Sequence, residues 1–340
     1  MLIRFKILTL DIGCRMLGGL RCDLESLDMV IRIGSRESAL AVAQAQQVMD
    51  WVATAMPDAE LALVTFKTKG DVLLEKKISE LGDKGLFVKE LEMALLAGEI
   101  DLAVHSMKDM PADLPDGLVL KSAGPREDAR DVMIGRTSAQ FEELPAGAVV
   151  GTSSLRRIAQ LTRRRPDLTY AMVRGNLNTR LKKLENGEYD ALILAAAGVH
   201  RLGWKDKITQ YFDAVTENIP AVGQGILGIE FAANNPLAVQ VAKVLCHPTV
   251  ETVMTAERTV LKALAGGCQT PLGVFASPHP DTPGKFLLTG VVLSVDGADV
   301  AEASLTFEAS SANGSGKALA QTLLSEGGQA ILDRVLQATP

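Results

Sequence analysis

After residue 28, the chain alternates short apolar runs with longer stretches in which apolar residues recur every three or four positions. The first pattern predicts buried strands and the second predicts amphipathic helices. The elements predicted for this first unit are a strand at 29–34, a helix at 35–56, a strand at 61–68, a helix at 86–99 and a strand at 100–107. We expect Ser35 or Ser38 to cap the first helix, because a serine oxygen accepts hydrogen bonds from the free N–H groups there.

A second unit repeats this alternation. Its predicted elements are a strand at 148–151, a helix at 154–165, a strand at 169–175, a helix at 178–188 and a strand at 189–198. The stretch "IGSRESALAVAQ" (33–44) is similar to "VGTSSLRRIAQ" (150–160), and "GEIDLAV" (98–104) is similar to "GEYDALI" (187–193). Any strand–glycine–helix unit would show part of this likeness. The repeated order nevertheless predicts two similar α/β lobes with parallel strands.

The last third of the chain shows a different order of predicted elements. The stretch 218–232 predicts a strand that returns between the lobes, followed by a helix at 251–266 that ends at Gly266 and Gly267. A hairpin with its turn at Asp296 and Gly297 is predicted for 285–309, and a last helix for about 316–337. The domains expected are lobe 1 at 29–125 with 226–243, lobe 2 at 126–225, and a small C-terminal α/β domain at 244–340.

The first 28 residues begin apolar and basic, as a signal peptide does. Asp11 interrupts the apolar run, and no small-x-small cleavage site follows it. We interpret this stretch as a non-essential extension that precedes a start at Met29 and leave its role unassigned. The sequence contains no run of 18 apolar residues, so no membrane span is expected. The protein is expected in the cytoplasm.

Charge is distributed unevenly along the chain. The 340 residues carry a formal net charge of −6, yet residues 151–183 contain nine Lys or Arg and a single acid, Asp167. A net acidic protein is a poor general binder of nucleic acid or membrane surfaces, because both are polyanions. The basic stretch therefore indicates a local site for an anion.

Arginines in both units lie where α/β sheets bind ligands. Arg36 follows the first strand, and Arg156 and Arg157 open a helix of the second unit, where free N–H groups attract anions. Arg174 and Arg180 come directly after the next strand, at the edge where ligands of open sheets bind. Because a guanidinium matches a carboxylate with two hydrogen bonds, the pattern predicts a cradle for several carboxylates or phosphates. A solvated helix face better explains the run at 163–165.

The stretch "HSMKDMP" (105–111) follows a predicted strand. His105, Ser106 and Asp109 do not indicate a hydrolase triad, because no G-x-S-x-G elbow is present and neighbours in sequence do not form triad geometry. Asp109 beside Lys108 suits proton transfer or the stabilisation of a cation. A turn aspartate before a proline explains the same spacing equally well.

The cysteines and glycines exclude some sites and leave one open. The four cysteines, at positions 14, 22, 246 and 268, contain no C-x-x-C pair, so no zinc or other metal site is expected. The stretch "GQGILG" (223–228) precedes a predicted strand and does not join a strand to a helix, so dinucleotide binding is rejected. Cys268 lies after two glycines in a loop, where a thiol suits covalent bonding, but a buried structural cysteine is an equal alternative.

Several longer motifs resemble one enzyme family. They are "IRIGSRESALA" (31–41), "DKGLFVKELE" (83–92), "AVHSMKDMP" (103–111), "GTSSLRR" (151–157), "RGNLNTRL" (174–181), "PAVGQG" (220–225) and "GGCQTPLG" (266–273). In this order they resemble porphobilinogen deaminase, or hydroxymethylbilane synthase. The resemblance implies two lobes like those of periplasmic binding proteins and a third small domain. It also implies a transferase that joins four porphobilinogen molecules into hydroxymethylbilane and releases ammonia.

The resemblance also implies roles for individual residues. Asp109 matches the catalytic aspartate, and Cys268 matches the cysteine that holds a dipyrromethane cofactor through a thioether. Contacts to the cofactor are implied for Lys84, Ser106, Lys108, Ser154, Arg156, Arg157 and Gln224. Contacts to substrate are implied for Arg36, Ser38, Phe87, Arg174, Arg180 and Arg201. Each pyrrole carries two carboxylates, which would account for the arginines. Ala265 departs from the acid found there in many relatives.

Two other functions were weighed. A non-catalytic two-lobed protein that binds a small anion would need no Cys268. A nucleic-acid-binding regulator is the weakest alternative, because Tyr170 is the single aromatic residue in the basic stretch and provides no stacking platform. The expected partner is therefore the small molecule porphobilinogen, with no nucleic acid and no membrane, and the protein is expected to be a monomer.

Overall fold

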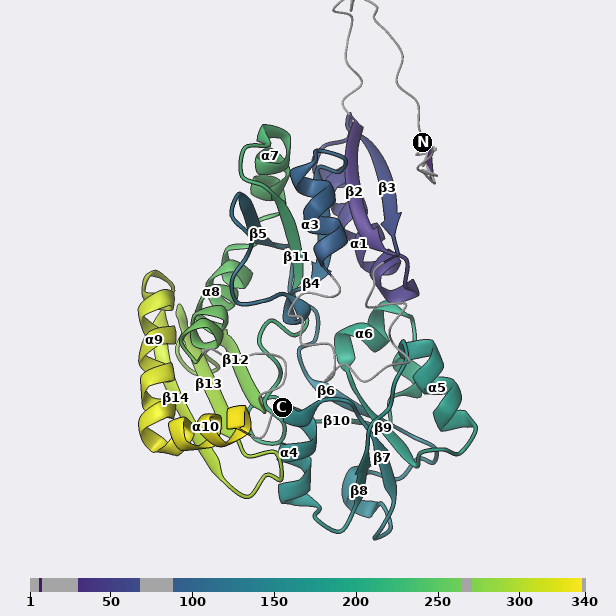
Figure 1. The fold of residues 1–340 in the computed structure, drawn as a ribbon, viewed down its shortest axis with the longest axis vertical. Helices are drawn as coiled ribbons and strands as arrows, with labels where there is room; N and C mark the ends of the chain where they lie inside the picture. Colours follow the sequence, from purple (N-terminus) through teal and green to yellow (C-terminus); the bar gives the residue numbers. More distant parts are fainter. Residues whose placement is uncertain (1–5, 8–29, 68–87, 265–270, 338–340) are drawn as a thin grey trace, which may run out of the picture.

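The computed structural model describes residues 6–7, 30–67, 88–264 and 271–337, which form three bodies that each contain one sheet (Figure 1). Two larger sheets form lobe 1 at the top and lobe 2 at the lower right of Figure 1, and a three-stranded sheet forms the C-terminal domain. The predicted architecture of two α/β lobes and a small third domain is confirmed. No described helix has the length and apolarity needed to cross a membrane.

Lobe 1 contains a six-stranded sheet in the order β1-β3-β2-β4-β11-β5. Its strands are β1 (Lys6–Ile7), β2 (Val30–Arg36), β3 (Glu60–Phe66), β4 (Leu102–Ser106), β5 (Leu118–Ala123) and β11 (Leu227–Ala232). The helices are α1 (Ala39–Ala55), α3 (Lys89–Leu96) and α7 (Pro236–Leu245). β2 runs parallel to β3 and β4, whereas β11 is antiparallel to both neighbours. β1, from the first 28 residues, adds an edge strand beside β3.

The two faces of this sheet follow the alternation of side chains along each strand. Leu102 and Val104 of β4 point into a core shared with α1 and α7, whereas Ala103 points into a core with α3. Ser38 caps α1, since its hydroxyl accepts from the Ala41 N–H at 3.3 Å. Of the two serines predicted for this role, Ser38 is the correct one.

Lobe 2 contains a five-stranded sheet in the order β10-β6-β9-β7-β8. Its strands are β6 (Asp131–Gly135), β7 (Val149–Gly151), β8 (Thr169–Ala171), β9 (Ala191–Ala195) and β10 (Gln210–Tyr211). The helix α4 (Leu155–Arg164) covers one face through Leu161, and α5 (Leu177–Glu185) with α6 (Ala196–Arg201) covers the other.

Three predicted strands were several residues too long. The strand predicted at 169–175 ends at Ala171. The strand predicted at 189–198 ends at Ala195, and Ala196–Arg201 forms α6, because an alanine-rich run carries no periodicity that separates strand from helix. The strand predicted at 218–232 begins only at Leu227. The residues before it are irregular backbone in which Gly223 and Gly225 adopt positive φ.

The C-terminal domain packs an antiparallel sheet against helices. Its strands are β12 (Leu272–Pro278), β13 (Lys285–Leu293) and β14 (Val300–Glu308), and its helices are α8 (Pro248–Ala263), α9 (Ala312–Leu323) and α10 (Gln329–Gln337). The predicted hairpin turn is confirmed, with Gly297 at φ 72°. A break at Gly327 divides the predicted last helix into α9 and α10. The predicted helix end at Gly266 and Gly267 lies outside the described residues.

Two chain segments cross between the lobes, and they are bonded to each other. The Glu127 N–H donates to the Gly225 carbonyl at 3.2 Å, and Arg126 Nε donates to the Gln224 carbonyl at 2.8 Å. Glu257 of α8 joins them, since its carboxylate accepts from Arg126 Nη1 and from the Gly223 N–H, both at 2.6 Å. All three bodies therefore meet at the crossing.

We expect Gly225→Ala to destabilise this crossing. Gly225 has φ 89°, and an added Cβ would overlap the carbonyl oxygen of Glu127. Left-handed strain of about 1–2 kcal/mol adds to overpacking of about 1–3 kcal/mol, so the free energy of unfolding should fall by about 3 kcal/mol. Urea unfolding followed by circular dichroism measures the loss.

Gly284→Ala is the matched control for this variant. Gly284 has φ 81°, close to that of Gly225, but no atom of a described residue lies within 4 Å of the added Cβ. It should lose only the strain of about 1–2 kcal/mol. Equal losses in the two variants would show that the close approach to Glu127 contributes nothing.

Candidate functional site

The N-terminus of α4 directs two arginines into the interior of lobe 2. Ser154 ends the turn after β7 and caps α4, and its hydroxyl accepts from the Arg157 N–H at 3.5 Å. Arg156 and Arg157 are the first polar residues on the inner face of this helix, and both are buried. The solvated end of the helix carries Arg163 and Arg164 instead.

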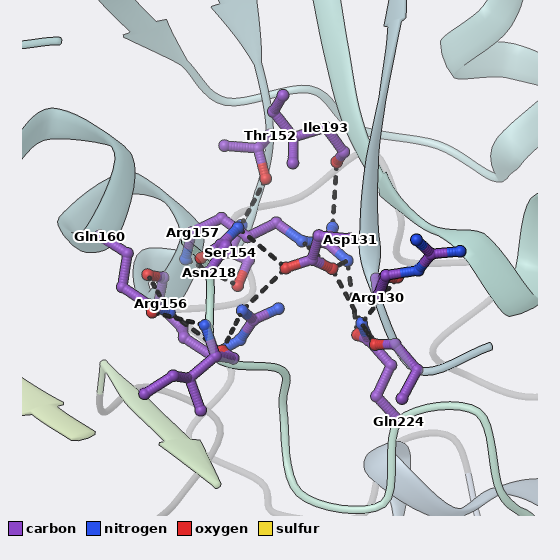
Figure 2. Close-up of polar contacts among 12 residues, drawn as sticks. Arg130, Asp131, Thr152, Ser154, Arg156, Arg157, Gln160, Ile193, Asn218 and Gln224 are labelled. Carbon is purple, nitrogen blue, oxygen red and sulfur yellow. Dashed lines mark hydrogen bonds and ion pairs between the residues drawn. The ribbon is translucent and has the colours of Figure 1, made fainter. Parts of the chain in front are cut away.

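Asp131 lies at the centre of this interior and is fully buried (Figure 2). Its carboxylate accepts from Arg157 Nε at 3.0 Å and Nη2 at 2.7 Å, and it pairs with Arg156 Nη1 at 2.8 Å. Asn218 Nδ2 at 3.0 Å and Gln224 Nε2 at 2.8 Å complete its surroundings. Burial alone would raise the pKa of Asp131, but the charges and hydrogen bonds of Arg156 and Arg157 hold it well below the usual value. Asp131 is therefore an anion.

Two guanidinium groups thus share one buried carboxylate. Arg157 Nη1 also donates to the Ile193 carbonyl at 3.0 Å, and Arg156 Nη1 donates to the Ile219 carbonyl at 2.7 Å. Arg156 Nε is buried and has no hydrogen-bond partner among the described residues. Burial lowers the pKa of Arg156, although Asp131 opposes this shift. The trio carries an excess positive charge and one unused buried donor, which suits an additional anion.

A short turn of lobe 1 brings a lysine and an aspartate towards this trio. β4 ends at Ser106, and a 3₁₀ turn follows at Met107–Asp109. Burial lowers the pKa of Lys108 to about 8; Asp109 opposes this shift, and the positive charge of Arg157 adds to it. Lys108 therefore lies within electrostatic reach of Arg157. Asp109 itself is exposed.

Arg180 of α5 joins the same charged group. Its Nε donates to the Gly175 carbonyl at 2.9 Å. Burial lowers the pKa of Arg180 to about 10; the charge of Arg157 adds to this shift, and that of Asp109 opposes it. We use the name basic cluster for Lys108, Arg156, Arg157 and Arg180, which come from both lobes and each interact electrostatically with Asp109 or Asp131.

Several residues predicted to contact cofactor or substrate have contacts outside the basic cluster. Ser106 Oγ accepts from Gln44 Nε2 at 2.8 Å, and Arg174 Nη2 contacts Met172 Sδ at 3.7 Å. Arg36 ends β2, and Ser38 caps α1. Gln224 lies within the site, bonded to Asp131.

Arg201 lies in a separate pocket between α1 and α6. It donates from Nε to Gln47 Oε1 and from Nη2 to the Gly225 carbonyl, both at 3.1 Å. The pocket has a volume of about 250 Å³ and is lined by Ala43, Gln47, Glu127, His200, Arg201 and Lys205. Burial lowers the pKa of Arg201 to about 10.

Three predicted site residues, Lys84, Phe87 and Cys268, lie outside the described residues. Asp131 is the functional residue that the sequence analysis missed. An acid at the start of an apolar strand, in "RDVMIG" (130–135), was the available signal, since such a residue is buried only when a cation compensates it.

Comparisons with known proteins agree with the motifs. A family model described as "Porphobilinogen deaminase, dipyromethane cofactor binding domain" matches residues 31–240. A second model, "Porphobilinogen deaminase, C-terminal domain", matches residues 252–325. The first match contains the whole basic cluster together with Asp109 and Asp131.

Relatives match over nearly their whole length. A porphobilinogen deaminase from Nostoc sp. is 44% identical over 315 residues, which cover 92% of this chain and 96% of the relative. One from Thiobacillus denitrificans is 46% identical over 303 residues, which cover 89% of this chain and 98% of the relative. A solved putative methionine-binding lipoprotein from Bacillus subtilis overlaps with a TM-score of 0.42 at 13% identity, covering 65% of this chain and 92% of that one.

We expect Asp131→Asn to destabilise the protein strongly. It would leave two buried guanidiniums without a counter-charge, and breaking a buried ion pair in this way costs about 3–5 kcal/mol. Because the folded pKa of Asp131 lies below the unfolded value of about 4, its stabilisation is present above that value and is lost as the pH falls through the folded pKa. The variant should therefore show a weaker decline of stability below about pH 4.

Asp299→Asn provides the comparison, measured by urea unfolding at several pH values. Asp299 pairs with Arg334 at 2.7 Å, but the two side chains are 50% and 60% exposed. Its loss should stay below about 1 kcal/mol. If Asp131→Asn were no more destabilised than Asp299→Asn, the carboxylate would not be the element that stabilises the two arginines.

Proposed function

Since this chain belongs to the porphobilinogen deaminase family, we propose that it joins four porphobilinogen molecules head to tail, releases ammonia at each addition and frees hydroxymethylbilane by hydrolysis. It is a transferase of porphyrin biosynthesis. The observation that carries this function is the match of the dipyrromethane-binding family model to the part of the chain that contains the basic cluster. The alternative, a non-catalytic anion-binding protein, is not favoured.

The residues present fit a dipyrromethane cofactor. The group carries acetate and propionate side chains, and Arg156 offers a buried Nε to which the part of the chain that the structure describes supplies no hydrogen-bond partner. We assign Ser154, Arg156 and Arg157, together with Ser106, Lys108, Lys84 and Gln224, to its contacts, and Cys268 to its thioether. When bound, the cofactor supplies the nucleophilic pyrrole carbon from which the chain grows.

Arg157 and Gln224 also bond to Asp131, and these bonds prepare the site for the cofactor. Their bonds to Asp131 fix the guanidinium plane before any ligand arrives. A pre-oriented donor loses less conformational entropy on binding than a free side chain. Asp131 therefore supports the anion site while it lowers the net charge of the site.

Asp109 is the group we assign to proton movement and charge stabilisation. Its exposed carboxylate is within electrostatic reach of Lys108 and Arg180. As ammonia leaves porphobilinogen, positive charge develops on the pyrrole nitrogen, and a nearby carboxylate lowers the energy of that charge. The same carboxylate accepts or relays the proton lost when the new carbon–carbon bond forms.

The substrate contacts remain a proposal based on charge. Arg180 belongs to the basic cluster, and Arg36 and Ser38 lie at the junction of β2 and α1. We assign the porphobilinogen carboxylates to Arg36, Ser38, Arg174, Arg180 and Arg201 collectively, and an apolar contact with the substrate to Phe87. Arg201 would act through the pocket between α1 and α6.

The domain limits are likewise proposed. We divide the chain into lobe 1 at 29–125 with 226–245, lobe 2 at 126–225 and a C-terminal domain from 246. The end of lobe 1 falls two residues later than the sequence suggested, since α7 continues to Leu245 and packs on the lobe 1 sheet. A cytoplasmic monomer without nucleic-acid or membrane partners is proposed from the family resemblance and the net acidic charge.

Intact-mass measurement tests the proposed tether. The purified protein should be heavier than its sequence by a dipyrromethane, and Cys268→Ser should lose both that mass and all turnover, because the thioether has no other sulfur at this position. Asp109→Asn is the matched variant, which should keep the added mass and lose turnover by at least about 100-fold. A fully active Cys268→Ser protein would refute the proposed function.

The lysine of the site predicts a pH dependence. With a pKa of about 8, Lys108 is cationic below that pH and neutral above it. If its ammonium holds a substrate or cofactor carboxylate, kcat/KM should decline above about pH 8 in the wild type. Lys108→Met should lower kcat/KM below pH 8 and abolish this decline, whereas Lys108→Arg should shift the decline to higher pH. An unchanged alkaline limb in Lys108→Met would remove Lys108 from the profile.

A further inference from the structure

The turn that carries Asp109 is packed into the C-terminal domain as well as into lobe 1. Met107 is buried, and its side chain belongs to the hydrophobic core formed by α8, α9 and the three-stranded sheet. Its N–H donates to the Ile226 carbonyl at 3.0 Å, in the crossing segment. A Cβ on Gly223 would lie 2.5 Å from Met107 Cγ, so only glycine leaves room for this packing. The residue two places before Asp109 is therefore held by another domain.

Arg258 of α8 holds the other end of the same turn. Its Nη2 donates to the Pro111 carbonyl at 2.8 Å and to the Ala112 carbonyl at 3.2 Å, and its Nη1 lies 4.0 Å from Met107 Sδ. One guanidinium thus contacts the chain on both sides of Asp109. Burial lowers the pKa of Arg258, while the charges of Asp113 and Glu230 favour the cation.

The helix that carries Arg258 is itself firmly placed. The preceding residue, Glu257, is fully buried and bonds to Arg126, Gly223 and the Ala276 N–H. α8 ends at Ala263, five positions before Cys268 in the sequence. One helix therefore bonds to the turn of the proposed catalytic aspartate and leads into the segment of the proposed cofactor cysteine.

We propose that Arg258 is a positioning residue that fixes the Met107–Ala112 turn, and with it Asp109, relative to α8. This inference rests on the proposed function for the role of Asp109. Both bonds come from Nη2, while Nη1 of the same guanidinium lies near Met107 Sδ, so one planar side chain reaches both ends of the turn. The half-buried carbonyls of Pro111 and Ala112 would lose their partner if the side chain were apolar.

Hydrogen exchange of the turn tests the contact without any dependence on activity. In Arg258→Met, amides within 107–113 should exchange at least about 10-fold faster than in the wild type, because local opening becomes easier when the anchoring bonds are lost. The melting temperature reports separately whether the whole domain is weakened. Arg258→Lys should restore part of the protection, since its ammonium can donate to the carbonyls but lacks the second nitrogen that lies near Met107.

Lys262→Met is the matched control on the same helix. Lys262 pairs with Asp113 at 2.6 Å, but the side chains are 68% and 73% exposed, so this pair should add little. Exchange within 107–113 and kcat should stay within about 2-fold of the wild type. If Lys262→Met changed exchange as much as Arg258→Met, a general effect of charge on α8 would replace the proposed anchor.

Turnover of variants separates positioning from a purely structural role. Arg258→Met should keep the dipyrromethane mass, show KM within about 2-fold and lose about 10- to 100-fold in kcat, because small displacements of a reacting group have effects of this size. In an Asp109→Glu background, where the carboxylate is already displaced, the same substitution should cost less than about 2-fold. Equal losses in the two backgrounds, or wild-type exchange within 107–113, would overturn the proposal.

These outcomes also distinguish the inference from the proposed function. A wild-type protein without the added mass and without hydroxymethylbilane synthesis would refute the function, while the exchange experiment would still report the anchor. A fully active wild type together with normal kcat in Arg258→Met would refute the inference alone.

Discussion

The buried carboxylate of Asp131, shared by the guanidiniums of Arg156 and Arg157, is the interaction on which the site depends. Charges are placed in a protein interior only when they are paired, because the loss of hydration costs several kcal/mol per ion. Here one anion serves two cations, so the pairing is incomplete by one charge. The folding of lobe 2 thereby creates a buried place that a further anion would stabilise.

This arrangement needs elements from three parts of the chain. β6 supplies Asp131, and α4 supplies the arginines. The irregular segment 218–226, which precedes β11, supplies Asn218 and Gln224. The crossing segment is also bonded to α8 through Glu257. The segment that places the arginines is therefore also bonded to the C-terminal domain, which joins the anion site directly to α8.

Local patterns predicted much of this fold, and non-local pairing limited the rest. The cap at Ser38 and the turn at Gly297 were predicted because each depends on a few adjacent residues. The end of β9 was misjudged because "AAAG" fits a strand and a helix equally well. The helix α7 went unpredicted although its Asn235 cap and the proline at its first position were readable signals.

In the site, too, the features that depend on adjacent residues were predicted and those that depend on distant residues were missed. The arginines of α4 were identified from local charge, and the family was recognised from the order of its motifs and is confirmed. The partner of these arginines was missed because Asp131 precedes them by 25 positions and nothing in sequence spacing connects an acid in one strand with a helix further along the chain. Arg258 belongs to none of the sequence motifs, and its proposed role depends on hydrogen bonds to carbonyl groups 146 and 147 positions away in the sequence.

The incomplete pairing at Asp131 also bears on why a covalent tether suits this protein. A ligand that neutralises the excess charge and binds only the folded state stabilises it by an amount that grows with the logarithm of the ligand concentration relative to its Kd. A reversibly bound anion would leave part of the population with an uncompensated interior. On the proposed function, a thioether at Cys268 makes the occupancy permanent, so the excess positive charge of Arg156 and Arg157 remains compensated through every addition. Stability and readiness for catalysis then rest on the same electrostatic balance, in which the carboxylate of Asp131 supplies one negative charge and the cofactor supplies the others.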